Sequence, residues 1–173
     1  MPSDPRFEDI WDQHCIKQAM ERYCRGCDRM DGALIDSAFW PDAHVDMGPW
    51  QGPGKEVSGL LLPIFKNDNA ATMHMIMQSH IEVTGPAAVG DTYFFGMHRR
   101  EKDGVSMMAA FGRYVDRFEK RHGEWRIAAR TVVMEHLENH EAAAAGDLSM
   151  DMFRRGRRGD GADLSYEGRT PVN

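Results

Sequence analysis

The apolar positions near the start of the chain follow a helical pattern. Within residues 8–28 they recur at intervals of three and four, which is the spacing of one face of an amphipathic α-helix. They are Ile10, Trp11, Ile16, Ala19, Met20 and Tyr23. Gly26 is expected to loosen the last turn. Shorter helices are expected over residues 32–39 and 55–65, with a brief strand over residues 44–48 between them.

After Asn69 the pattern changes to long runs that are typical of β-strands. Four runs are expected, joined by short turns that contain glycine: Thr72 to Val83, Ala87 to Lys102, Val105 to Arg121 and Trp125 to Met134. The Asp103–Gly104 pair between two of them is a strong hairpin signal. Helices followed by an antiparallel meander predict an α+β fold with the helices on one face of the sheet.

These runs are too long for a flat sheet. A strand of about 15 residues spans roughly 50 Å, whereas a domain of this size is only roughly 40 Å across. The sheet must therefore curl, and Gly90, Gly96 and Gly112 inside the runs are the expected bends. A strongly curved antiparallel sheet with the N-terminal helices across its open side makes a cone, with a pocket between sheet and helices.

Length and charge limit the function classes. The chain has 173 residues, with 21 Lys+Arg against 27 Asp+Glu and a formal net charge of −6. This length predicts one domain, residues 1–140, and a C-terminal tail, residues 141–173, packed on the domain or on a partner subunit. A separate cofactor domain does not fit. The acidic balance argues against a nucleic-acid partner. The absence of a long apolar run argues against a membrane partner.

Several familiar kinds of site are not predicted. The cysteines all lie in the first segment, without distant partners, which favours a reducing compartment and a cytoplasmic location. Cys24 and Cys27 form a single Cys-x-x-Cys inside a helix, which does not make a zinc site. Asp42, His44 and Asp46 could share a strand face but have no further ligand cluster. No Rossmann, Walker, GxSxG or HExxH pattern occurs, so we expect neither a metal nor a cofactor.

Two residues are candidates for an acid–base pair. Asp28 lies near the C-terminus of the first helix, where the helix dipole disfavours a carboxylate. It is either capped by Arg25 or Arg29, or it orients a basic side chain in the pocket. His74 is either a structural histidine of the interior or that basic side chain, which Asp28 would hold in one tautomer and make more basic.

The strand that carries His74 has two different faces. By alternation, one face is mixed and polar and would suit a binding cavity; it holds Thr72, His74, Ile76, Gln78 and His80. The other face holds Met73, Met75 and Met77 and would suit a second subunit, although the 13 methionines of the chain are also good core filler.

Arg130 is a candidate for charge stabilisation. Alternation places it on the strand face of Arg126 and Ala128, opposite Trp125 and Ile127. Because small and apolar residues flank Arg130, it either points inward and binds an oxyanion or leaving group, or pairs with a glutamate at the surface.

Five short motifs occur in a fixed order between Phe7 and His136. They are RYCRGCDRMD at 22–31, FWPDA at 39–43, TMH at 72–74, GRYVDRF at 112–118 and HGEWRI at 122–127. In this order they resemble the SnoaL-like branch of the NTF2-like superfamily. The resemblance implies a cone-shaped, cystatin-like α+β fold, commonly a dimer or trimer, but a fold alone does not settle an activity.

Members of this branch include scytalone dehydratase, bile-acid 7α-dehydratase and hexachlorocyclohexane dehydrochlorinase, which use an Asp–His pair. By this resemblance Asp28 and His74 are the catalytic pair, and Arg130 and Tyr23 are further catalytic residues. Tyr23 is five residues from Asp28, or about 140° around an ideal helix, so the two converge only if Gly26 breaks the helix or the pocket wraps around its end.

The resemblance implies a cofactor-independent lyase of the dehydratase type. The substrate would be a hydrophobic polycyclic or aromatic small molecule, bound by Ile76, Gln78 and His98, with His98 in place of a second histidine if it reaches the cavity. The alternatives are a ketosteroid-isomerase-like proton shuttle and a scaffold like the small subunit of ring-hydroxylating dioxygenases. A hydrogen-bonded Asp28–His74 pair lining a cavity favours an enzyme, whereas a cone filled by Met and Phe favours a scaffold.

Overall fold

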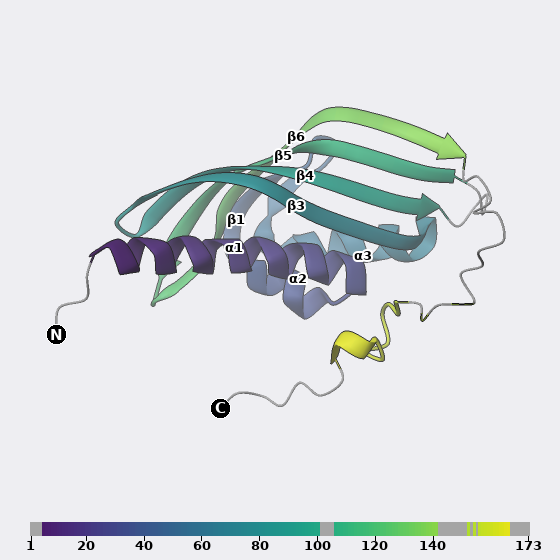
Figure 1. Ribbon diagram of the computed structural model, residues 1–173, viewed down its shortest axis with the longest axis horizontal. Helices are drawn as coiled ribbons and strands as arrows, with labels where there is room; N and C mark the ends of the chain where they lie inside the picture. Colours follow the sequence, from purple (N-terminus) through teal and green to yellow (C-terminus); the bar gives the residue numbers. More distant parts are fainter. Residues whose placement is uncertain (1–4, 101–105, 142–151, 153, 155, 167–173) are drawn as a thin grey trace.

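A curved sheet covers the helices in the computed structural model, which describes residues 5–100, 106–141, 152, 154 and 156–166 (Figure 1). The helical elements are α1 (Pro5–Arg29), α2 (Gly32–Ala38), η1 (Gly54–Glu56), α3 (Val57–Asp68) and η3 (Leu164–Tyr166). The strands are β1 (Phe39–Asp46), β2 (Gln51–Pro53), β3 (Asn69–Thr84), β4 (Ala87–Arg100), β5 (Ser106–Arg121) and β6 (Glu124–Glu141). The predicted Asp103–Gly104 turn lies outside the described residues.

The strands form one mixed sheet in the order β2-β1-β6-β5-β4-β3. The long strands β3 to β6 make the predicted antiparallel meander, and the α+β class is confirmed. β1 pairs with β6 in parallel, a long-range contact that the local pattern does not show. Because β3 ends the order, one edge of its backbone has no neighbouring strand within the sheet.

Bulges in β3 and β6 shift the side-chain alternation that the sequence predicts. The pairing of β3 with β4 shifts by one residue between Ile76 and Ser79, so Ser79 shares the inner face with Ile76. His80 therefore does not share the face of His74, as alternation suggested, because an extra residue inverts every later position. A similar shift in β6 lies between the partners of Arg117 and Phe118.

The core lies between the inner face of the sheet and the helices. α1 and α2 cross closely at Gly26, where a Cβ would lie 2.7 Å from Cγ1 and 2.8 Å from the backbone nitrogen of Ile35. Gly26 therefore allows α2 to pack against α1, and it does not break the helix, which continues to Arg29. The chain then reverses at Met30, whose φ is +55°.

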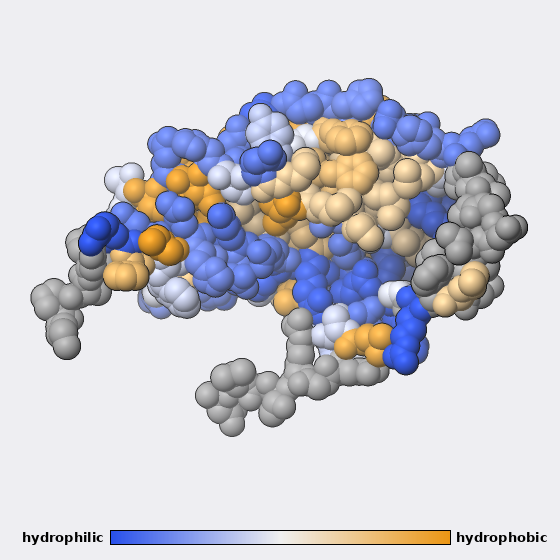
Figure 2. Space-filling model, in the orientation of Figure 1, coloured by the Kyte–Doolittle hydropathy of each residue, from blue (hydrophilic) through white to orange (hydrophobic). Residues whose placement is uncertain are grey.

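The outer face of the sheet is apolar and exposed. Met73 and Met77 expose about half of their surface, and Met75 exposes 38%. The pairing register aligns Met75 with Phe95 and Phe111 on the next strands. Figure 2 shows an apolar area over these strands. Such a face fits the expected contact with a second subunit, and that assembly stays a prediction. Among the described residues, no helix is long and apolar enough to cross a membrane.

Gly26→Ala tests the close crossing of α1 and α2. We expect a loss of about 1–3 kcal/mol in the free energy of unfolding, because the new methyl group meets backbone atoms that cannot rotate away. The matched control is Gly59→Ala in α3, where a Cβ meets nothing within 4 Å and the stability should rise by up to about 1 kcal/mol. Urea denaturation measures both, and equal effects would contradict this packing.

Candidate active site

Asp28 joins the end of α1 to the edge of the sheet. Its Oδ1 lies 2.7 Å from Nδ1 of His74. The backbone N–H of His74 also donates to Oδ1 and Oδ2, at 3.1 and 2.9 Å. This N–H faces the unpaired edge of β3, so the carboxylate replaces a missing strand. One carboxylate therefore fixes both the backbone and the ring of His74.

The contact also fixes the tautomer of His74. A carboxylate only accepts hydrogen bonds, so Nδ1 carries the hydrogen and Nε2 of the neutral ring keeps a free lone pair. The side chains are mostly shielded from solvent, with 7% of His74 and 14% of Asp28 exposed. Neither Arg25 nor Arg29 caps Asp28, because both contact the C-terminal segment instead. This is the geometry of an oriented general base.

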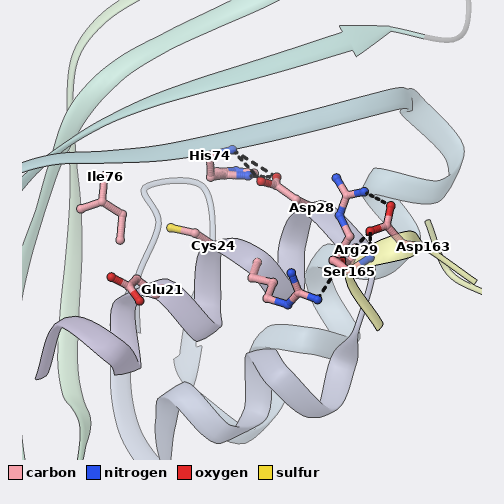
Figure 3. A pocket seen from close by; sticks show the side chains of 9 residues that line it. Glu21, Cys24, Asp28, Arg29, His74, Ile76, Asp163 and Ser165 are labelled. Atoms are coloured by element: carbon pink, nitrogen blue, oxygen red, sulfur yellow. Dashed lines mark hydrogen bonds and ion pairs between the residues drawn. The ribbon is translucent and has the colours of Figure 1, made fainter. Parts of the chain in front are cut away.

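The pair lines a pocket of about 470 Å³ between α1, β3 and the C-terminal segment. Its lining residues are Glu21, Cys24, Arg25, Asp28, Arg29, His74, Ile76, Asp163 and Ser165. In Figure 3 the Asp28 carboxylate points to His74, while Glu21 and Ile76 lie toward the other end. The pocket is thus bordered by ionisable groups and is not filled by methionine and phenylalanine.

His98 lies beside His74 but faces a second hollow. The two rings meet edge to face with their centroids 5.2 Å apart, and Phe65 lies within 6 Å of both ring centroids. His98 lines a neighbouring pocket of about 400 Å³. Burial, with a contribution from His74, lowers the pKa of His98 to about 4, so its imidazole is neutral at physiological pH.

Tyr23 and Arg130 lie in the core and not along this pocket. Arg130 is fully buried and forms two parallel hydrogen bonds with Asp116, at 2.8 and 2.6 Å. Its Cζ lies 4.0 Å from the ring centroid of Tyr114 and 4.7 Å from that of Tyr23. Although burial opposes the charge, the carboxylate of Asp116 raises the pKa of Arg130. Arg130 thus points inward, and its carboxylate partner is the buried Asp116 and not a surface glutamate.

The β6 bulge explains why alternation misplaced Arg130. The extra residue at Ala128 puts Arg130 on the same inner face as Ile127, opposite Asp116 of β5. Tyr23 remains on the core side of α1, since the helix continues unbroken past Gly26. The separation of about 140° between Tyr23 and Asp28 is thereby kept.

Of the other expected substrate-binding residues, Ile76 lines the pocket of the dyad and Gln78 does not. Ile76 borders the main pocket and also a hollow of about 260 Å³, which Gln78 lines. Gln78 is exposed and lies within the register shift between Ile76 and Ser79, so it does not face the same space as His74.

Sequence reasoning missed the rest of the lining. Glu21, Arg25 and Asp28 follow an i, i+4, i+7 spacing, which could have placed them on one face of α1. Asp163 and Ser165 carry no such signal, because a long-range contact brings them to the pocket. Asp163 binds Arg29 at 2.9 Å, and Ser165 accepts a hydrogen bond from Arg25 at 2.9 Å.

The geometry disfavours two other chemistries at this pocket. Burial raises the pKa of the Cys24 thiol to about 12, so this lining residue is a poor nucleophile at neutral pH. Within the described ranges, no group of three or more His, Cys, Asp or Glu side chains could hold a metal ion.

A match to a protein-family model shows which family the chain belongs to. The model of the SnoaL-like domain matches residues 8–131. The chain belongs to the SnoaL-like domain family. This membership covers both Asp28 and His74, and it agrees with the motif order along the sequence. Comparison with curated protein sequences finds no match.

Solved structures show the same fold at low sequence identity. A type 2 hexachlorocyclohexane dehydrochlorinase is 16% identical, with 83% of this chain and 99% of that chain covered and a TM-score of 0.73. A putative scytalone dehydratase from Novosphingobium aromaticivorans is 18% identical, with coverages of 82% and 97% and a TM-score of 0.69. The Kfla4162 protein from Kribbella flavida is 16% identical, with coverages of 75% and 95% and a TM-score of 0.69.

The neutral state of His98 predicts a pH-dependent stability. The folded protein keeps His98 neutral down to a pKa of about 4, whereas the unfolded chain binds a proton below about pH 6.5. This stabilisation is complete above pH 6.5 and is lost as the pH falls toward 4. Between pH 7 and 5, His98 should account for a loss of about 2 kcal/mol.

His98→Gln should remove this contribution. Urea denaturation at pH 7 and 5 measures it, with His44→Gln, at an exposed strand position, as the matched control. An equal loss of stability with pH in the wild type and in His98→Gln would contradict a buried, neutral His98.

Proposed function

We propose that the protein is a cofactor-independent lyase that eliminates water from a small molecule by general-base catalysis at His74. The observation that carries the proposal is the contact of 2.7 Å between Asp28 and Nδ1 of His74, which leaves Nε2 as the proton acceptor. Two solved structures of the same fold are named as a hexachlorocyclohexane dehydrochlorinase and a putative scytalone dehydratase, and elimination is the reaction that these two names share.

The proposed reaction balances with a single base. Nε2 of His74 takes a proton from a carbon next to an activating group, and the electrons of that C–H bond form the new double bond. The hydroxyl on the adjacent carbon leaves, and the imidazolium returns the proton to it, so that water departs and His74 is neutral again. Asp28 stabilises the transient imidazolium by their ion pair.

Arg130 and Tyr23 do not enter this proposal as groups that touch the substrate. Both lie in the core, where Nε and Nη2 of Arg130 donate to Asp116, and neither lines the pocket of the dyad. Ile76 contributes an apolar wall, and Gln78 and His98 border hollows on either side. The proposed substrate is a hydrophobic polycyclic or aromatic alcohol that binds in the pocket between α1 and β3.

Asp28→Asn and His74→Gln test the dyad. The protein is incubated with a panel of hydroxysteroids and polyketide-like β-hydroxy ketones, and mass spectrometry detects products that have lost one water. Each variant should lower the rate by roughly 10²–10⁴, the usual contribution of a positioned base, while circular dichroism shows an unchanged fold.

His80→Gln is the matched control, because His80 lies on the same strand with its side chain 79% exposed. It should keep the wild-type rate. Wild-type rates in both dyad variants would contradict the proposal. A rearranged product of unchanged mass would instead support the proton shuttle.

A further inference from the structure

Arg25 is a cation of the pocket, and it has no counterion within the described part of the chain. It lies one turn before Asp28 on α1 and lines the same pocket as His74. Its Nη2 donates to Oγ of Ser165 at 2.9 Å, and its Cζ lies 4.8 Å from the ring centroid of Tyr166. Its Nε is shielded from solvent and finds no hydrogen-bond partner among the residues that the structure describes. Both partners of the guanidinium are therefore neutral.

The neighbouring arginines differ from Arg25 in this respect. Ion pairs with carboxylates hold Arg22 to Glu124, Arg29 to Asp163, Arg126 to Glu124 and Arg130 to Asp116. No such pair involves Arg25 among the described residues. Glu21, one turn earlier on α1, instead accepts a hydrogen bond from Gln18, and the carboxylate of Asp28 is engaged by His74.

A half-buried guanidinium without a counterion favours an anion. It has five N–H donors in a planar fork, and one of them is used by Ser165. Hydrogen bonds from such a charged donor to an oxyanion are roughly twice as strong as neutral ones. Arg29, the other arginine of the lining, already donates to Asp163 and to the carbonyl of Arg157, so Arg25 is the pocket cation with donors to spare.

The C-terminal segment, residues 156–166, holds Arg25 in place. The hydroxyl of Ser165 donates to Asp163 at 2.5 Å, and Asp163 in turn binds Arg29. The hydroxyl of Tyr166 donates to Asp31 at 2.9 Å. The two residues that bind the segment, Arg29 and Asp31, lie at the end of α1 and just after it. The segment thus forms a wall of the pocket, and its contacts hold the guanidinium of Arg25 at that wall.

We infer that Arg25 anchors an oxygen of the substrate that carries or develops negative charge, and that Ser165 and Tyr166 are its positioning residues. This inference rests on the proposed function. It specifies the substrate as one with a carbonyl or carboxylate group beside the C–H bond that His74 attacks. When that bond breaks, the electrons delocalise onto the carbonyl oxygen, and Arg25 stabilises the resulting enolate.

A pair of matched probes tests the preference for an anion. Isothermal titration calorimetry measures the binding of 2-naphthoate and of the neutral, nearly isosteric 2-naphthamide. The wild type should bind naphthoate about tenfold or more tightly than naphthamide. Arg25→Gln should abolish this preference, and Arg25→Lys, which keeps the charge but not the fork, should keep part of it.

Arg22→Gln is the matched control, because Arg22 lies one turn earlier on the same helix and does not line the pocket. It should keep the full preference. A wild type that does not prefer naphthoate, or an Arg25→Gln variant that still does, would overturn the inference.

The positioning role has its own test. Ser165→Ala should weaken the naphthoate preference, and Ser165→Thr, which retains a hydroxyl, should restore it. Equal preference in the wild type and in Ser165→Ala would contradict positioning by Ser165.

The two proposals fail separately. His74→Gln should retain the naphthoate preference, because binding needs no base. If elimination is found but Arg25→Gln leaves both its rate and the naphthoate preference unchanged, the inference fails and the proposed function stands. If the preference depends on Arg25 but both dyad variants retain the wild-type rate of elimination, the proposed function fails and the inference about Arg25 stands.

Discussion

The site depends on the carboxylate of Asp28, which connects a helix end to a sheet edge. An edge strand presents backbone N–H groups without a neighbouring strand, and a helix C-terminus is a poor place for a negative charge. Asp28 meets both needs at once. Its carboxylate accepts hydrogen bonds from the edge N–H of His74 and from the ring of His74, and these donors stabilise the negative charge at the end of the helix. The close crossing at Gly26 and the reversal at Met30 set where α1 ends, and so where this carboxylate lies.

The arginines of the chain divide into structural and available charges. Arg130 shows the structural kind: breaking a buried ion pair costs about 3–5 kcal/mol because a charge is left uncompensated, so its pairing with Asp116 ties β5 to β6 inside the core. Arg25 shows the other kind: its partners in the described part of the chain, Ser165 and Tyr166, are neutral, and it lines the pocket. Residue type and spacing along the sequence do not distinguish a structural arginine from an available one. The distinction depends on whether a strand or segment distant in the sequence brings a carboxylate to the guanidinium.

The sequence predicted the elements and the Asp28–His74 pairing better than it predicted which residues share a face. Helical periodicity and short turns are local, so α1 and the meander could be expected, and the motif order directed attention to Asp28 and His74. Alternation fails after a bulge, which is why His80 does not share the face of His74 and why Arg130 shares the face of Ile127. Residues 163–166 reach the pocket through contacts more than a hundred positions apart, and no local pattern reports such a contact.

The state of the His74 ring tests the central claim most directly, since it needs no substrate. Nitrogen-15 NMR of the histidine side chains, at a pH where the ring is neutral, distinguishes a protonated ring nitrogen from one with a free lone pair. The structure predicts a proton on Nδ1 and a free Nε2 in the wild type, and a loss of this preference in Asp28→Asn. A wild-type ring protonated on Nε2 would contradict the account.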